Sequence, residues 1–179
     1  MKLEEPIRTE RLVLREFVES DFDQVHEYGS DPEVVRFVPW GPNTPDATRA
    51  FIQRCLDSQL AENRKSYDLA AVVEDENRII GGIGIRKIDS HGDTASFGYV
   101  FNRNYWGKGY ATEAARAIIR FGFDTLKVHR IEAICDIENT GSFRVLEKSG
   151  MRREGMLREN LRLRDHFRNS YMYAIIRTD

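Results

Sequence analysis

The stretch that decides the fold is Asn104-Tyr105-Trp106-Gly107-Lys108-Gly109-Tyr110-Ala111-Thr112. It follows a segment typical of a strand and precedes residues 110–126, whose apolar positions repeat with helical periodicity. Glycines such as Gly107 and Gly109 permit unusual backbone dihedrals and close approach of a ligand. The first turn of a helix offers free N–H groups and a positive dipole end, and Lys108 adds a charge. The stretch therefore predicts an anion-binding turn, with a ligand-free glycine turn as the alternative.

Two other phosphate-binding motifs do not match this turn. A Walker loop needs Ser or Thr after its lysine to hold magnesium, whereas Gly109 follows Lys108 here. A dinucleotide-binding turn needs a third glycine where this chain has Thr112, and it follows the first strand of a parallel unit. The strands that precede this turn are typical of hairpins instead.

On both sides of this turn, the sequence predicts further strands and helices, and it contains no repeats or linkers. Strands are expected at residues 11–16, 67–73, 79–88, 95–101, 130–135, 156–163 and 170–176. Helices are expected from Ser20-Asp21 to Gly29, from Thr44-Pro45 onward, over 110–126, and from Asn139 to Ser149. In the second helix the expected buried stripe is Ala47, Ala50, Phe51, Cys55 and Leu56. This order predicts one α+β domain over residues 1–179, with a mostly antiparallel central sheet and helices on its faces.

Composition narrows the functional classes. The chain has 27 Lys and Arg against 29 Asp and Glu, a net charge of −2, so its global charge gives no reason to expect a nucleic-acid or membrane partner. No apolar run approaches the ~20 residues that span a bilayer, and Met1 to Pro6 lack an apolar leader. Cys55 and Cys135 are expected to be free thiols, so a cytoplasmic protein is predicted. The four histidines lack ligand spacing, so no metal is expected.

The glycine turn resembles motif A of the GCN5-related N-acetyltransferases (GNAT), whose pattern is Gln/Arg-x-x-Gly-x-Gly/Ala. Here it reads Asn104-x-x-Gly107-x-Gly109, with both glycines matched and the first position different. The longer run 105–114 resembles the RimJ/RimL subgroup, which acetylates the N-termini of ribosomal proteins. Residues 9–15, 139–142, 145–151 and Glu154-Gly155 also resemble this subgroup, so the resemblance covers nearly the whole chain.

This resemblance implies a splayed sheet that holds acetyl-CoA, with its pantetheine beside the strand that ends near residues 101–103. The N–H groups of residues 106–110 would receive the pyrophosphate, and a backbone N–H near Phe101 would polarise the thioester carbonyl. The cofactor-binding residues implied are Phe101, Asn102, Arg103, Trp106, Gly107, Lys108, Gly109, Tyr110, Ala111, Thr112, Asn139 and Ser142.

The reaction of the family is direct attack of a neutral amine on the thioester, which requires a base for the amine and an acid for the departing thiolate. Ser142 is the predicted acid, because it stands one helical turn after Asn139 and can face the same gap. The alternative is that Asn139 is only an N-cap and Ser142 only the third helical residue.

The base is less clearly indicated. The subgroup carries a glutamate at the position of Leu161, and Glu159 would share its face on a strand. Glu16, Tyr99 and a water chain are the other candidates, and Glu16 is also a candidate acceptor-binding residue. Trp40, in a loop that the resemblance places beside the acceptor, either clamps the acceptor or packs in the core.

The expected acceptor is the N-terminal amine of a protein. A small amine such as a polyamine, an amino acid or an aminoglycoside is the alternative within the same chemistry. A non-catalytic acyl-CoA-binding module is the alternative outside it. The chain is expected to be a monomer or a homodimer.

Overall fold

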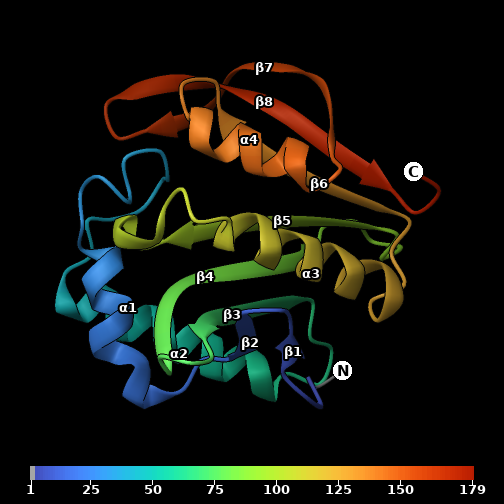
Figure 1. The fold of residues 1–179 in the computed structure, drawn as a ribbon. Helices are drawn as coiled ribbons and strands as arrows, with labels where there is room; N and C mark the ends of the chain where they lie inside the picture. The colour runs from blue at the N-terminus through green and yellow to red at the C-terminus, as the bar shows by residue number, and fades with distance from the viewer. Residues whose placement is uncertain (1–2) are drawn as a thin grey trace.

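Eight strands form one sheet in the order β1-β2-β3-β4-β5-β6-β8-β7 (Figure 1). The computed structural model describes residues 3–179, so Met1 and Lys2 of the segment expected to lack a leader lie outside the described residues. The strands are β1 (Ile7–Arg8), β2 (Leu12–Glu16), β3 (Ser66–Val73), β4 (Arg78–Lys87), β5 (Thr94–Phe101), β6 (Arg130–Asp136), β7 (Arg152–Leu163) and β8 (His166–Ile176). The helices are α1 (Phe22–Gly29), α2 (Pro45–Leu60), α3 (Tyr110–Asp124) and α4 (Thr140–Lys148). Short 3₁₀ turns, Glu19–Asp21 and Arg103–Tyr105, precede α1 and the glycine turn.

Neighbouring strands are antiparallel with one exception. β5 and β6 are parallel, and they pair only between Thr94–Ser96 and Arg130–Glu132. The rest of β5, up to Phe101, is unpaired on that side, so the sheet opens between β5 and β6. The predicted α+β class and the mixed, mostly antiparallel, splayed sheet are confirmed.

Apolar side chains on the two faces of the sheet build two cores. On one face, Leu12, Leu14, Ile83 and Ile85 pack with the buried side of α3. On the other face, the core contains residues of α1, α2, β3 and β4, namely Val25, Tyr28, Ile52, Cys55, Ala70, Val72 and Ile79. Figure 1 shows α3 and α4 on the viewer's side of the sheet, and the opening between β5 and β6 lies between these two helices.

Local sequence fixes the helix starts. Thr44 caps α2 by accepting a hydrogen bond from Ala47 N, and Pro45 takes the first helical position. Asn139 caps α4 by accepting from Ser142 N at 3.0 Å. Both helices therefore begin within a residue of the predicted positions.

The structure corrects three details. The two-residue strand β1 was not expected, because so short a segment shows no alternation. The hairpin strands β7 and β8 begin four residues earlier than predicted. The buried face of α2 is rotated, with Thr48, Ile52 and Cys55 buried while Ala47 and Ala50 are exposed.

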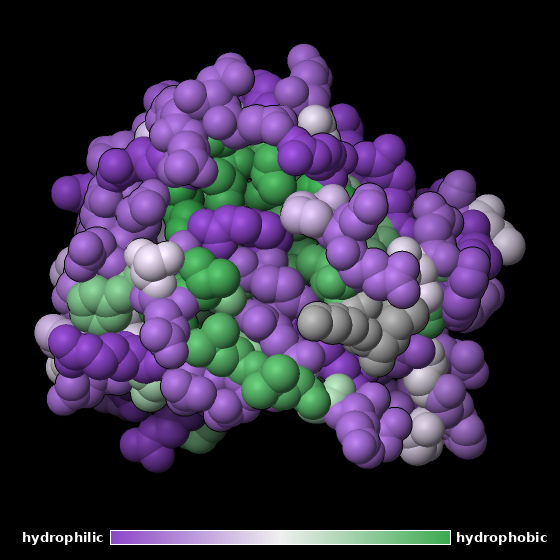
Figure 2. Space-filling model, turned by 90° about the horizontal axis from the view of Figure 1, so that it is seen from below, coloured by the Kyte–Doolittle hydropathy of each residue, from purple (hydrophilic) through white to green (hydrophobic). Residues whose placement is uncertain are grey.

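Most of the surface is polar. Figure 2, viewed from the end of the molecule where β1, β2 and α2 lie, shows hydrophilic residues surrounding apolar ones that gather toward the middle of this face. Within residues 3–179, no helix combines the length and apolarity needed to cross a membrane.

Candidate active site

The glycine turn has the geometry of an anion site. Gly107 and Gly109 have φ values of 74° and 86°, a region that L side chains rarely adopt. Gly109 is the N-cap of α3 and makes no side-chain capping bond, so the first N–H groups of this helix lack a side-chain partner. A Cβ at Gly107 would meet no heavy atom within 4 Å, so the turn is open above it. The turn therefore fits a pyrophosphate on backbone N–H groups.

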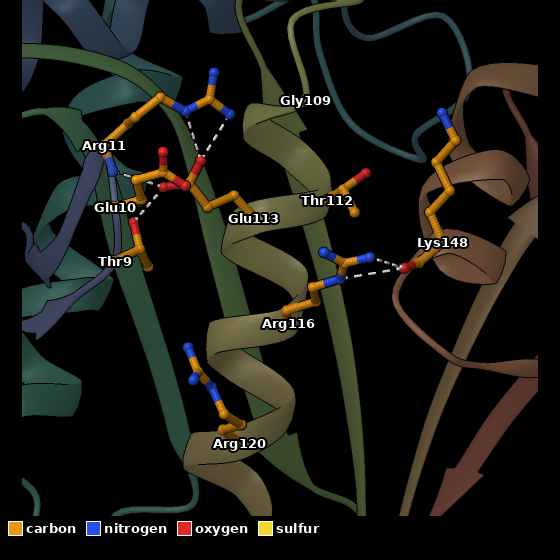
Figure 3. Close-up of a pocket in the computed structure, with 9 residues that line it drawn as sticks. All are labelled: Thr9, Glu10, Arg11, Gly109, Thr112, Glu113, Arg116, Arg120 and Lys148. Carbon is orange, nitrogen blue, oxygen red and sulfur yellow. Dashed lines mark hydrogen bonds and ion pairs between the residues drawn. The ribbon is translucent and has the colours of Figure 1, made fainter.

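A cavity of about 430 Å³ adjoins this turn on the outer face of α3 (Figure 3). On one side, Arg11 pairs with Glu113 at 2.7 Å, and Thr9 Oγ1 donates to the same carboxylate at 2.6 Å. On the other side, Arg116 donates to Lys148 O at 2.7 Å. Arg116, Arg120 and Lys148 have no carboxylate partner in residues 3–179. This flank is therefore cationic, which suits a polyanionic ligand at the adjoining turn.

Side chains that the family resemblance implies to be cofactor-binding hold the turn in place. Trp106 Nε1 donates to Phe101 O at 2.7 Å. Asn102 is buried, and its amide accepts from Asn104 N and donates to Glu27. Arg103 pairs with Asp31 at 2.9 Å. The side chains of Asn102, Arg103 and Trp106 thus all contact other groups of the protein, so these residues position the turn.

The remaining residues of this group lie around α3. The ring of Tyr110 stacks under the Arg11 guanidinium, 4.4 Å from its centroid, and Lys108 Nζ lies 5.1 Å from the ring centroid of Tyr105. Thr112 lines the outer cavity, and Ala111 packs against the core.

A larger cavity of about 930 Å³, here called the central cavity, begins at the opening between β5 and β6. Tyr99, Asn139 and Ser142 all line it. Tyr99 OH donates to Ser142 O at 3.1 Å and lies 2.9 Å from Ser142 Oγ. Burial raises the pKa of Tyr99, although the bond to Ser142 opposes the shift, so this phenol keeps its proton near neutral pH. Tyr99 therefore suits a proton donor better than the predicted base.

Cys135 also faces the central cavity. Burial raises the pKa of its thiol to about 11, against opposing contributions from Arg168 and Ser142. Both cysteines are free and buried. At neutral pH Tyr99 and Cys135 therefore both keep their protons and are uncharged.

The far side of the central cavity is formed by α2, the loop after α1 and the β7–β8 hairpin. We call this side, residues 35–55 and 161–168, the acceptor wall. We use the name cofactor wall for β5 and α4, which line the central cavity, together with α3, whose glycine turn adjoins the smaller cavity. Trp40 is 38% exposed on the acceptor wall and lines the cavity, as do Ala47 and Ala50. Trp40 is therefore not a core residue, and the rotated face of α2 turns its alanines toward the cavity.

Two arginines tie the hairpin to this loop. Arg164 donates to Arg36 O and to Val35 O, each at 3.2 Å, and Arg168 donates to Phe37 O. Arg168 is 8% exposed, and its Nε has no hydrogen-bond partner in residues 3–179. In Figure 1 the left end of the hairpin accordingly reaches over the loop that follows α1.

The structure does not bring the two predicted glutamates to the central cavity. Glu159 is exposed with a φ of 47°, in the register break between Leu157 and Leu161, so the alternation that would align it with Leu161 is interrupted. Glu16 makes a two-pronged ion pair with Arg64 at 2.5 and 3.1 Å. Its strand neighbours Leu12 and Leu14 face α3, so Glu16 alternates onto the face opposite the acceptor wall.

Sequence reasoning missed two carboxylates that do line the cavity. Asp136, on β6, is 7% exposed and lies 3.9 Å from Arg168. Asp68, on β3, is half-buried and accepts a hydrogen bond from Ser66 Oγ at 3.1 Å. An acid inside an otherwise apolar strand, across from the glycines of β4, was the available signal.

Comparison with known proteins identifies the family. Residues 11–152 match the model of the acetyltransferase (GNAT) domain, and the chain belongs to this family. It is 38% identical over 170 residues to the uncharacterized N-acetyltransferase YnaD of Bacillus subtilis (strain 168), covering 95% of this chain and 96% of that one. A GNAT-family acetyltransferase structure from Bacillus anthracis superposes with a TM-score of 0.87 at 38% identity, covering 97% and 99%. The protein is an acetyl-CoA-dependent N-acetyltransferase, as the resemblance of its sequence to this family implied.

More distant relatives differ in their acceptors. RimL, a ribosomal L7/L12 α-N-protein acetyltransferase solved with CoA, shares the fold with a TM-score of 0.84 at 19% identity, covering 96% of this chain and 98% of RimL. Spermidine N(1)-acetyltransferase of Escherichia coli (strain K12) is 25% identical over 162 residues, covering 90% of this chain and 84% of that one.

Proposed function

We propose that this protein transfers the acetyl group of acetyl-CoA to the N-terminal amine of a protein or peptide. The observation that carries the proposal is the central cavity, which runs from Ser142 and Tyr99 to the exposed ring of Trp40. At about 930 Å³ it has room for a thioester arm and for the first residues of a chain. The resemblance to RimL supports the same acceptor class.

The charges of the cavity favour a peptide over a polyamine. Three arginines line it, Arg54, Arg86 and Arg168, against two carboxylates, Asp68 and Asp136. A polycation would meet more like charge than opposite charge there. A peptide N-terminus carries one positive charge and a series of carbonyl groups that guanidinium groups can bind. The spermidine acetyltransferase relative keeps the polyamine as the second candidate.

In the proposed reaction, acetyl-CoA enters with its pyrophosphate on the glycine turn and its pantetheine along the unpaired side of β5. The neutral acceptor amine attacks the thioester carbonyl, the C–S bond breaks, the new amide nitrogen loses its surplus proton to solvent, and the thiolate takes a proton. Ser142 Oγ, 2.9 Å from Tyr99 OH, is the proposed proton donor. Since the phenol of Tyr99 keeps its own proton, it can return one to Ser142.

The test is a screen of acceptors by mass. Purified protein and acetyl-CoA are incubated with peptides of varied first residue, with spermidine and with amino acids, and products are weighed. Acetylation of peptides at their α-amine, with spermidine unmodified, is the expected result. Transfer to spermidine alone would overturn the acceptor class, and tight acetyl-CoA binding without transfer to any amine would favour a binding module.

A further inference from the structure

The proposed reaction requires a group that takes a proton from the acceptor ammonium, and the placement of Glu159 and Glu16 removes both from contact with the cavity. Among the described residues, Asp68 and Asp136 are the carboxylates that line it. Asp136 is nearly fully buried, accepts from Glu138 N at 2.9 Å and faces Arg168. Asp68 is half-buried, and its Oδ1 accepts no hydrogen bond from residues 3–179. Each oxygen of Asp136 thus faces a hydrogen-bond or ion-pair partner, whereas Asp68 Oδ1 has neither among residues 3–179, so Asp68 is the carboxylate with an unused oxygen.

Two glycines on neighbouring strands separate Asp68 from the open edge of β5. In the sheet register Asp68 pairs with Gly84, and Gly84 pairs with Gly98, so the three residues stand side by side on β3, β4 and β5. A Cβ at Gly84 would collide with Asp68 Oδ1, so the carboxylate lies directly over this glycine. A Cβ at Gly98 would meet no heavy atom within 4 Å. An open floor therefore runs from the Asp68 carboxylate to β5.

The floor leads to the reacting end of the cavity. Neighbouring strands lie about 4.8 Å apart, so a carboxylate over Gly84 is about one strand spacing from Gly98. Gly98 lies beyond Ser96, where the pairing of β5 with β6 stops, and it precedes Tyr99. Gly98 and Tyr99 alternate onto opposite faces of β5, and the opening beyond Ser96 joins these two faces. A primary amine above Gly98 would thus lie beside Asp68 and meet the thioester and the Tyr99–Ser142 pair through that opening.

We propose that Asp68 binds the ammonium of the acceptor over Gly98 and acts as its general base. The inference rests on the proposed function and assigns its missing residue. An N–H proton of the ammonium passes to Asp68 Oδ1, and the freed lone pair attacks the thioester carbonyl. After the C–S bond breaks, Ser142 protonates the thiolate, and the new amide nitrogen loses its second surplus proton to solvent. Solvent returns a proton to the Tyr99–Ser142 pair, and Asp68 releases its own proton to solvent through the exposed part of its side chain, so that one proton is released in all. Because side chains are absent at 84 and 98, the floor admits a primary amine on a slender chain.

Charged and titratable groups from several elements surround Asp68. Arg54 on α2 and Arg86 on β4 line the same cavity. Cys55 on α2 is a neutral neighbour, because burial raises the pKa of its thiol to about 12. Arg168 and Asp136 lie across the cavity on β8 and β6.

The experiment compares the wild type with Asp68→Asn, Asp68→Glu and Gly98→Leu, using a peptide acceptor found in the screen. Asp68→Asn keeps the shape of the side chain and is expected to lower kcat/KM about 100-fold, the usual contribution of a general base. Its activity should then rise with pH until the amine itself is deprotonated, while the acetyl-CoA Kd stays unchanged. Asp68→Glu should recover part of the rate, and Gly98→Leu should raise the acceptor KM by filling the floor.

The matched control is Glu159→Gln, which neutralises an exposed carboxylate outside the cavity and should leave every readout unchanged. An Asp68→Asn variant with the wild-type kcat/KM and pH profile would overturn the role of Asp68 and leave the proposed function standing. Absence of transfer by the wild type to every amine would overturn the proposed function and this inference with it.

Discussion

The cofactor wall and the acceptor wall are built in different ways. The cofactor wall consists of β5, α3 and α4, regular elements that pack on the larger core, and its ligand-facing turn is backbone at two left-handed glycines. The acceptor wall consists of α2, a loop and a hairpin, joined by guanidinium bonds from Arg164 and Arg168 to loop carbonyls. A wall of backbone and regular elements suits a ligand that stays the same, whereas loops tolerate change. The contrast indicates that chemistry and acceptor recognition can be altered separately.

The largest effect is expected at the Tyr99–Ser142 pair. Ser142→Ala should lower kcat by at least about 100-fold with every acceptor, because it removes the proposed proton donor. The acetyl-CoA Kd, measured by calorimetry, should not change. Ser149→Ala is the control, since it removes a hydroxyl that bonds Val145 O on the same helix outside the cavity. Undiminished turnover in Ser142→Ala would exclude this serine from the chemistry.

The second-largest effect is expected for a substitution in the glycine turn. Gly109→Val places a β-branched residue at a φ of 86°, which costs about 1–3 kcal/mol and distorts the start of α3. We expect the acetyl-CoA Kd to rise about 100-fold once lost phosphate contacts are added to that strain. Gly155→Ala is the control, because a Cβ there meets no heavy atom within 4 Å and its φ is not left-handed. Equal affinity of Gly109→Val and the wild type would contradict the assignment of the turn.

The two walls also differ in how well the sequence predicted them. In the cofactor wall, the predicted residues lie close together along the chain. Gly107 and Gly109 belong to one turn, and Asn139 and Ser142 belong to the start of one helix. Their proximity follows from sequence spacing, so it could be predicted before the fold was known. The acceptor wall depends on contacts across more than 100 residues, such as Arg168 with Phe37, which no local pattern records.

Strand alternation failed where the backbone departed from it. Glu159 was placed by counting two residues from Leu161, and the positive φ at Glu159 breaks that count. Asp68 follows the alternation, but its proposed role depends on two glycines of other strands. These glycines become its neighbours only through the sheet register.

A smaller effect, confined to the other wall, is expected for Arg168→Met. It removes the bond to Phe37 O and leaves Asp136 buried without its cation, so stability should fall by about 3 kcal/mol. The acceptor KM should rise while the acetyl-CoA Kd stays unchanged, as followed by denaturant unfolding and steady-state kinetics. Arg164→Met, at a more exposed residue of the same hairpin, should have a weaker effect of the same kind. If Arg168→Met weakened acetyl-CoA binding as much as acceptor binding, the two walls would not be separable.

The smallest effect is expected at Glu113, which fastens α3 to Thr9 and Arg11. Burial raises the pKa of Glu113, but hydrogen bonds from Thr9 and Arg11 outweigh it, so the net pKa is lowered. A lowered folded-state pKa means that this carboxylate stabilises the protein above its unfolded value of about 4.3, and that this stability is lost as pH falls through the folded value. Glu113→Gln should therefore cost about 1–2 kcal/mol at pH 7 and less at pH 3, measured by urea unfolding across pH.

Glu154 provides the comparison for this prediction. Its pKa is also lowered, by the hydrogen bond from Arg130, but its side chain is 46% exposed, so solvent screens the pair and Glu154→Gln should cost less. Because Glu113 holds the start of α3, its neutralisation should also weaken acetyl-CoA binding, whereas neutralisation of Glu154 should not. A penalty for Glu113→Gln that stays constant from pH 7 to pH 3 would contradict the ion pair as its source, and would indicate that packing of the side chain fastens α3 instead.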